Sequence, residues 1–250
     1  MTMFAIIGGS GLNRIEGLEV VRREKLSTPY GEPSAALTFG KLDGAEIVFL
    51  ARHGDAHVLA PHLINYRANI RALHDCGARN VIAVATVGGI REDLIPGALV
   101  VPDQIIDYTH GRASTFFDGV EQPLAHVDFT QPFSGALRAL LLQAGAAAGE
   151  SLYDGGVYGA TQGPRLETAA EIRRMARDGA DLVGMTGMPE AVLAREMGLC
   201  YAMLAVVVNA AAGIGANRDG VAIEEIRAVS AAAMKRVATV LAHVAECHGR

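Results

Sequence analysis

The feature that most limits the possible folds of this chain is a series of short apolar runs separated by helix-like segments. Most of the runs are continuously apolar rather than alternating, which is typical of strands covered on both faces of a sheet. The runs are residues 4–7, 47–50, 81–85, 99–101, 182–185 and 202–208. The segments with helical periodicity and end signals are residues 65–76, 134–148, 168–177, 189–197 and 223–247. This alternation predicts an α/β fold with a central mixed, twisted β-sheet flanked by helices.

The size and composition of the chain favour one domain over residues 1–250. Half of the 250 residues are hydrophobic and 29 are glycine, so the chain can bury a sizeable core. The net charge of −5 and the absence of a basic run make nucleic acid an unexpected partner. Cys76, Cys200 and Cys247 are scattered and lack metal-ligand spacing, so we expect no disulfide, no metal and a cytoplasmic location.

One uncharged stretch, residues 197–216, is long enough to be tested as a membrane span. It is rich in alanine and contains Gly198, Gly213, Gly215 and Asn209. Glycine breakers and an internal amide are typical of a buried strand that runs into a loop. We therefore expect a strand and loop here, and no membrane as a partner.

Polar side chains follow several of the predicted strands. The stretch "IIGGSGL" places Ser10 on a glycine-rich turn, where a hydroxyl and backbone N–H groups can hold an anion. Such turns also occur for steric reasons alone. The stretch "LARHGDAH" places Arg52, His53 and His57 after another strand, and a salt-bridged surface pair is the alternative interpretation there.

Three more stretches repeat this arrangement. In "GATQGPRLET", Glu167 stands just before a predicted helix, where its charge could also simply complement the helix dipole. In "VGMTGMPE" and "VVVNAAAG", Thr186 and Asn209 stand at the ends of strands. Ligands of open α/β sheets bind beyond the carboxyl ends of the strands, so we expect these side chains to converge on one site.

Taken together, the segments "IIGGSGL", "ARHGDAHVLAPHLINYRANIRAL", "GATQGPRLETAAE", "VGMTGMPEAVLAREMGLCYA" and "VVVNAAAG" resemble the trimeric purine nucleoside phosphorylase and methylthioadenosine phosphorylase family. The resemblance covers nearly the whole chain. It implies the nucleoside phosphorylase fold and a pentosyltransferase of purine salvage, which cleaves the N-glycosidic bond of a nucleoside with inorganic phosphate. It also implies that phosphate is a co-substrate, that no cofactor or metal is needed, and that the chain forms a homotrimer.

The resemblance assigns roles to individual residues. Ser10, Arg52, His53, Thr86 and Thr186 match phosphate-binding positions, and Arg52 can offer forked donors to the anion. Met185 matches the residue beneath the ribose, Val87 lies near the same pocket, and His57 is expected to contact the substrate. A neighbouring subunit commonly supplies a His and an aromatic residue, for which His126 and Phe116 or Phe117 are the candidates.

The expected base follows from departures within the family. Members that take 6-aminopurines have Asp at the positions of Asn209 and Ala211, and this chain has neither. A 6-oxopurine presents two acceptors, O6 and N7, and one donor, N1–H. An Asn amide suits the acceptors, and the Glu167 carboxylate suits the donor, so we expect a 6-oxopurine with Asn209 and Glu167 as the catalytic pair.

The expected sugar is unusual. Relatives that act on ordinary nucleosides use a His for the 5′-hydroxyl, whereas "VAIEEI" after the Asn209 loop holds Val221, Ile223 and Ile226. An apolar wall favours a 5′-methylthio group, and Ile223 at the helix start is the predicted wall residue. The expected substrate is therefore S-methyl-5′-thioinosine.

Four alternatives remain open on the sequence. A broad inosine and guanosine phosphorylase and a methylthioadenosine phosphorylase lie within the same family. The "RHG" at 52–54 also occurs in histidine phosphatases. A protein that binds nucleosides without cleaving them is the last alternative.

Overall fold

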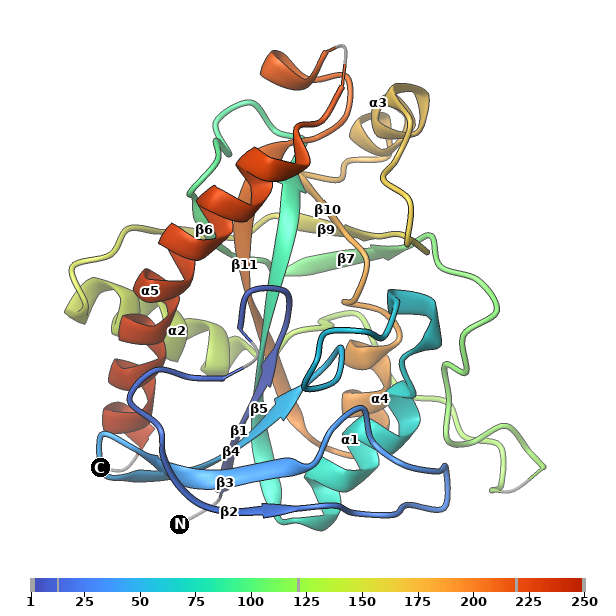
Figure 1. The fold of residues 1–250 in the computed structure, drawn as a ribbon. Coiled ribbons are helices and arrows are strands. Elements are labelled where there is room, and N and C mark those ends of the chain that lie inside the picture. The colour runs from blue at the N-terminus through green and yellow to red at the C-terminus, as the bar shows by residue number, and fades with distance from the viewer. Residues whose placement is uncertain (1–2, 13, 121, 219, 249–250) are drawn as a thin grey trace.

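The computed structural model describes residues 3–12, 14–120, 122–218 and 220–248. In this part of the chain, a twisted sheet of 11 strands has helices on both faces (Figure 1). The strands are β1 (Met3–Gly8), β2 (Glu19–Glu24), β3 (Leu37–Leu42), β4 (Ala45–Ala51), β5 (Ala78–Gly89), β6 (Leu99–Val101), β7 (Gln104–Asp107), β8 (Leu152–Asp154), β9 (Val157–Ala160), β10 (Leu182–Gly184) and β11 (Cys200–Ala210). The predicted α/β fold with a mixed sheet is confirmed, and each of the predicted strands overlaps one of these elements.

The long strand β5 lies at the centre of the sheet, and its two edges are paired differently. Strand β11 runs parallel along one edge as far as Gly89. On the other edge, the pairing with the parallel strand β1 ends at Ala83, whereas the antiparallel strand β10 pairs only with Gly88 and Gly89. In the described part of the chain, residues 84–87 therefore have no strand partner on that edge. This gap is where the site opens.

Two pairs of helices cover the two faces of the sheet (Figure 1). Helix α1 (Tyr66–Asp75) packs beside α4 (Glu190–Glu196) on one face, and α2 (Gly135–Ala147) packs beside α5 (Ile223–His248) on the other. Each pair shares its own hydrophobic core with the sheet. Helix α3 (Ala169–Arg177) covers a smaller apolar cluster next to the site. All five predicted helices are confirmed to within one residue at each end.

The strands that the sequence did not reveal lack a continuous apolar run. Strand β2 is exposed along its whole length and mixes Val20 and Val21 with charged residues, as edge strands do. Strands β7, β8 and β9 have only three or four residues each. The strands that carry the predicted site residues do not all run in one direction, because β10, and β9 parallel to it, run opposite to β5.

Two segments bear on the question of a membrane. The prediction for residues 197–216 is confirmed, because β11 is buried for most of its length and a loop follows it. Residues Ile223–Cys247 of α5 are long and apolar enough to span a membrane by length and composition alone. The apolar stripe of α5, which includes Ala233, Val237 and Val240, is buried against the sheet and α2. Packing in the core accounts for this composition.

Candidate active site

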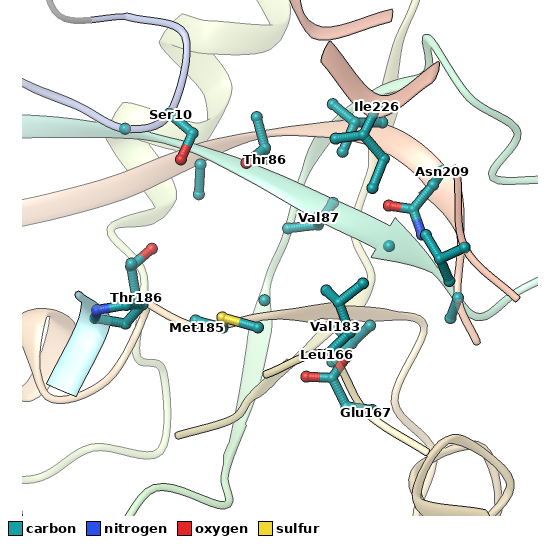
Figure 2. Close-up of a pocket in the computed structure, with 18 of the residues that line it drawn as sticks. Ser10, Thr86, Val87, Leu166, Glu167, Val183, Met185, Thr186, Asn209 and Ile226 are labelled. Atoms are coloured by element: carbon teal, nitrogen blue, oxygen red, sulfur yellow. The ribbon is translucent and has the colours of Figure 1, made fainter. Parts of the chain in front are cut away.

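A pocket opens in the gap beside β5, between the residues that follow β1 and those that follow β10. In Figure 2, Ser10, Thr86 and Thr186 lie at one end of this pocket, and Asn209 and Glu167 lie at the other. We call these the anion end (Ser10, Arg52, His53, Thr86 and Thr186) and the base end (Glu167, Asn209 and Ala211). Every predicted site residue lines the pocket except His57 and Ile223.

The glycine-rich turn after β1 is set by packing. A Cβ on Gly8 would lie 2.1 Å from the carbonyl oxygen of Leu12, and one on Gly9 would lie 2.6 Å from that of Val84. Neither position has room for a side chain, so the steric interpretation of these glycines is right. The close approach of Gly9 to β5 delivers the half-buried Ser10 to the pocket, where its hydroxyl faces the same space as those of Thr86 and Thr186 (Figure 2).

Arg52 is fully buried and paired with a residue that the sequence analysis did not single out. Its Nε and Nη2 atoms donate to the two carboxylate oxygens of Glu190 at 2.7 and 2.8 Å, and Nη1 donates to the carbonyl of Val84 at 2.9 Å. The hydroxyl of Tyr201 also donates to Glu190 at 2.8 Å. Burial by itself disfavours the charged guanidinium, but the carboxylate outweighs it, so the pKa of Arg52 lies above its ordinary value.

The ion pair changes the expected mode of anion binding. The forked donors of Arg52 bind the carboxylate of Glu190 and not a ligand. Only the remaining N–H groups on Nη1 and Nη2 are left to bind a ligand anion. The carbonyl of Val84, which the gap in the sheet leaves without a strand partner, is satisfied by the same side chain. Arg52 therefore supports the floor of the anion end while its charge is balanced by Glu190.

His53 is held as a neutral ring. Its Nδ1 lies 2.8 Å from the carbonyl oxygen of Leu59, which can only accept, so Nδ1 carries the proton and Nε2 is an acceptor. Burial, together with the nearby charge of Arg52, lowers the pKa of His53 to about 4 against the opposing effect of the hydrogen bond to Leu59. His57 itself is exposed, its ring centroid lies 4.7 Å from that of His53 with the two rings tilted by 48°, and its Nε2 lies 3.4 Å from the hydroxyl of Ser10. It touches the anion end from outside the pocket.

The base end is built from the loop before α3 and from the end of β11 with the loop that follows it. Glu167 precedes α3 and is half-buried, and its Oε1 accepts a 2.6 Å hydrogen bond from the hydroxyl of Thr161. Asn209 is also half-buried, and its amide nitrogen donates to the carbonyl of Ala210 at 2.6 Å. Asn217 donates to the same carbonyl, which fixes the loop after β11. Ala211 is buried and lines the pocket between these groups.

The predicted apolar wall is displaced by one helical turn. Ile223 begins α5 but is 50% exposed and does not line the pocket, so its predicted role as the wall is wrong. Val221 and Ile226 line the pocket instead, and Figure 2 shows Ile226 above it on the same side as Asn209. Side chains three residues apart lie on neighbouring positions of a helix face, and here packing turns only the second one inward.

A further residue that sequence analysis missed is Arg112, which joins two loops of the site. Its guanidinium donates to the carbonyls of Thr161, Gln162, Met185 and Met188, to the side chain of Gln162 and to the hydroxyl of Tyr66. It thereby ties the loop before Glu167 to the loop that carries Thr186. Met185 lines the pocket between its two ends, as Figure 2 shows. No local sequence signal marks Arg112, because its acceptors are backbone groups far along the chain.

The three residues predicted to reach the site of a neighbouring subunit, Phe116, Phe117 and His126, differ in their exposure to solvent. Phe116 is 3% exposed and packs on Tyr30 with ring centroids 4.9 Å apart, so it belongs to the core of its own chain. Phe117 is partly buried against the same core. His126 is exposed and stays a prediction. Among the described residues, no group of three His, Cys, Asp or Glu side chains is placed to hold a metal ion.

Known sequences match nearly the whole chain. The family model of the Phosphorylase superfamily matches residues 3–246. A protein of Xanthomonas campestris named probable S-methyl-5′-thioinosine phosphorylase is 52% identical over 228 residues, which are 91% of each chain. A 6-oxopurine nucleoside phosphorylase of Pyrococcus furiosus is 46% identical over 223 residues, which are 87% of this chain and 83% of the other.

Solved structures give the same picture of the fold. The methylthioadenosine phosphorylase of Schistosoma mansoni in complex with adenine superposes with a TM-score of 0.94 at 30% identity, covering 100% of this chain and 92% of the other. The same protein in its apo form superposes with a TM-score of 0.90 at 29% identity. The overall arrangement of strands and helices is therefore one that solved structures also have.

Proposed function

The chain belongs to the phosphorylase superfamily, and we propose that it catalyses the phosphorolysis of S-methyl-5′-thioinosine. The products are hypoxanthine and 5-methylthioribose 1-phosphate. The observation that carries the proposal is that Asn209 and Glu167 both line one end of the pocket. The other end holds three hydroxyl groups and Arg52, whose charge is balanced by Glu190. A 6-oxopurine and a phosphate fit these two ends, with the sugar between them.

The reaction joins an oxygen of phosphate to C1′ as the bond from C1′ to the base nitrogen breaks. The sugar becomes cationic and the base gathers negative charge, so the site must stabilise both ends of a separating pair. At the anion end, the hydroxyls of Ser10, Thr86 and Thr186 and the free N–H groups of Arg52 bind the phosphate. The neutral Nε2 of His53 accepts a hydrogen bond from a P–OH group.

At the base end, the amide of Asn209 donates to O6 or N7 of the purine, where negative charge develops as the bond breaks. The Glu167 carboxylate accepts from N1–H. Met185 packs beneath the ribose, and Val221 with Ile226 faces the 5′ substituent. An apolar wall of this kind favours a thiomethyl group over a hydroxyl, which would be left without a partner.

A general 6-oxopurine nucleoside phosphorylase is the second candidate. Similar relatives carry that name, including the one from Pyrococcus furiosus. The two candidates share the base end and the anion end and differ only in the 5′ group. The apolar lining by Val221 and Ile226 favours the methylthio substrate.

The test is release of hypoxanthine from S-methyl-5′-thioinosine with and without phosphate, beside inosine and S-methyl-5′-thioadenosine at equal concentrations. We expect release that depends on phosphate and a kcat/KM that is highest for S-methyl-5′-thioinosine. Equal rates in phosphate-free buffer would exclude phosphorolysis, and a higher kcat/KM for inosine would favour the second candidate. We also propose a homotrimer, as the family resemblance implies, and a fully active monomer by light scattering would contradict it.

A further inference from the structure

Thr161 anchors the carboxylate at the base end. Its hydroxyl oxygen lies 2.6 Å from Oε1 of Glu167 and 3.3 Å from the carbonyl oxygen of Gly184. A hydroxyl has one proton to donate, and the much shorter contact shows that Glu167 receives it. The carboxylate of Glu167 is therefore held by a donor from the protein before any base arrives.

Thr161 itself is fixed to the sheet and cannot easily follow a ligand. It comes directly after β9, and its backbone N–H donates to the carbonyl of Gly184 at 2.8 Å. Its own carbonyl accepts from Nη2 of Arg112 at 3.1 Å. The side of the carboxylate that bears Oε1 is thus tied to β9 and β10. In the described part of the chain, no hydrogen bond is formed to Oε2, which is the oxygen left for a base.

The purines that a 6-oxopurine site can meet differ in how many acceptors they need. Hypoxanthine presents one donor on this edge, N1–H, and one free carboxylate oxygen satisfies it. Guanine presents N1–H and the 2-amino group side by side, and both are satisfied only by two carboxylate oxygens acting as a fork. To bind guanine in this way, Oε1 must accept from the 2-amino group while the Thr161 hydroxyl already occupies one of its lone pairs, so the hydroxyl restricts the direction from which the amino group can approach.

We propose that Thr161 is a specificity-determining residue that makes this site select 6-oxopurines without a 2-amino group. The inference rests on the proposed function, because it takes Glu167 as the group that reads N1–H. It adds a distinction within the 6-oxopurines that the apolar wall and the anion end do not make. Thr161 acts through Glu167 and does not touch the base.

The test compares S-methyl-5′-thioguanosine with S-methyl-5′-thioinosine, so that the 5′ group is the same in both substrates. In the wild-type protein we expect a lower kcat/KM for the guanine nucleoside. Thr161→Val keeps the shape of the side chain and removes the donor, which frees Oε1. This variant should raise the ratio of guanine to hypoxanthine kcat/KM by about fivefold or more, the usual size of one hydrogen bond. The KM for phosphate should stay the same.

Two variants serve as controls. Thr161→Ser keeps the hydroxyl and should keep the wild-type ratio. Thr115 forms a matched pair elsewhere, because its hydroxyl donates to Oε1 of Glu196 at 2.7 Å and is also partly buried. Thr115→Val should leave the ratio unchanged. A ratio in Thr161→Val within about twofold of wild type, below the effect of a typical hydrogen bond, overturns the proposal.

A binding measurement keeps the proposal testable if Thr161→Val does not fold or if the wild-type protein releases no base. Calorimetry of hypoxanthine and guanine with the wild-type protein in phosphate buffer needs no turnover. We expect guanine to bind more weakly, and tighter binding of guanine overturns the role of Thr161. Absence of turnover with this order of affinities would instead count against the proposed reaction alone.

Discussion

The two ends of the pocket are built in different ways. At the anion end, Arg52 and Glu190 are fully buried. Their hydrogen bonds join Arg52 to the first residue of α4 and to the carbonyl of Val84 in β5. At the base end, Glu167 and Asn209 are half-buried, lie on the loop before α3 and at the end of β11, and are anchored by single hydrogen bonds from Thr161 and to Ala210. The first end is part of the core of the molecule, and the second is attached to it.

This difference suggests how one scaffold serves several nucleosides. Every phosphorolysis needs the same phosphate, so the groups that hold it can be integrated into the core without loss of function. Specificity for a base needs groups that can change without unfolding the chain, and loop positions tolerate such changes better than core positions. Substitutions at the anion end should therefore cost stability, whereas those at the base end should cost specificity.

The largest effect is expected for Glu190→Ala. Removing the carboxylate leaves the buried charge of Arg52 without its partner, which typically costs about 3–5 kcal/mol of unfolding free energy. Denaturant unfolding followed by circular dichroism measures this cost. Tyr201→Phe removes only the 2.8 Å hydrogen bond to Glu190 and should cost about 1 kcal/mol.

A double substitution separates the ion pair from the rest of the core. Arg52→Met with Glu190→Met removes both charges and should regain much of the lost stability, since apolar residues often replace a buried pair at little cost. Phosphorolysis should not return, because the N–H groups of Arg52 are then gone. A cost below about 1 kcal/mol in the single Glu190→Ala variant would show that the anion end is not integrated as the geometry indicates.

The buried pair also shows where sequence reasoning stops. The five helices and the strands with continuous apolar runs could be predicted because their patterns are local, and so could Ser10 and Thr186, which follow strands. Arg52 and Glu190 are 138 positions apart, and the sequence around each residue gives no sign that the other is its partner. The roles of Thr161 and Arg112 could not be predicted from the sequence for the same reason. They depend on backbone carbonyls and a carboxylate that only folding brings together.

The next effect concerns pH and again belongs to the anion end. Burial lowers the pKa of His53 from 6.5 to about 4, so the folded state resists a proton that the unfolded chain takes up. The stability from His53 is complete above pH 6.5 and is lost as pH falls from 6.5 toward 4. Between pH 7 and pH 4.5 the wild-type protein should lose on the order of 2–3 kcal/mol more than His53→Gln, whose amide can still donate to Leu59.

Unfolding curves at the two pH values measure this difference. His126→Gln changes an exposed histidine and should behave as the wild-type protein does. An equal loss in the wild-type protein and His53→Gln would show that His53 does not set the acid sensitivity of the anion end.

A smaller effect, confined to activity, is expected at the base end. Asn209→Asp removes a donor to O6 and N7 and should lower kcat/KM for S-methyl-5′-thioinosine by about 5- to 100-fold, as a mismatched polar pair does. Adding Ala211→Asp should raise activity on S-methyl-5′-thioadenosine. The unfolding free energy of Asn209→Asp should change by less than that of Glu190→Ala, because Asn217 still donates to the carbonyl of Ala210. An unchanged preference between the two nucleosides would mean that other residues read the base.

The smallest effect is expected at the 5′ wall, where the sequence predicts Ile223 and the structure places Val221 and Ile226. Ile226 is the first member of the apolar stripe of α5 that continues through Val229 and Ala233, and that stripe is the face that packing turns inward. Ile223 lies one turn earlier on a neighbouring position of the same face, but at the very start of the helix it is 50% exposed. Periodicity therefore allowed both residues, and the position at the helix start separates them.

Ile226→His should give the 5′-hydroxyl of inosine a hydrogen-bond partner and remove apolar contact with the thiomethyl group. The two changes together should move the ratio of kcat/KM toward inosine by roughly 5- to 30-fold, equivalent to about 1–2 kcal/mol. The KM for phosphate should hardly change, because Ile226 lies on the side of Asn209 and away from the anion end (Figure 2). Ile223→His is the matched control, since it places the same side chain one turn away at an exposed position and should leave the ratio at its wild-type value. If Ile223→His moves the ratio and Ile226→His does not, α5 faces the sugar through Ile223, and of the two wall residues Val221 and Ile226 only Val221 remains.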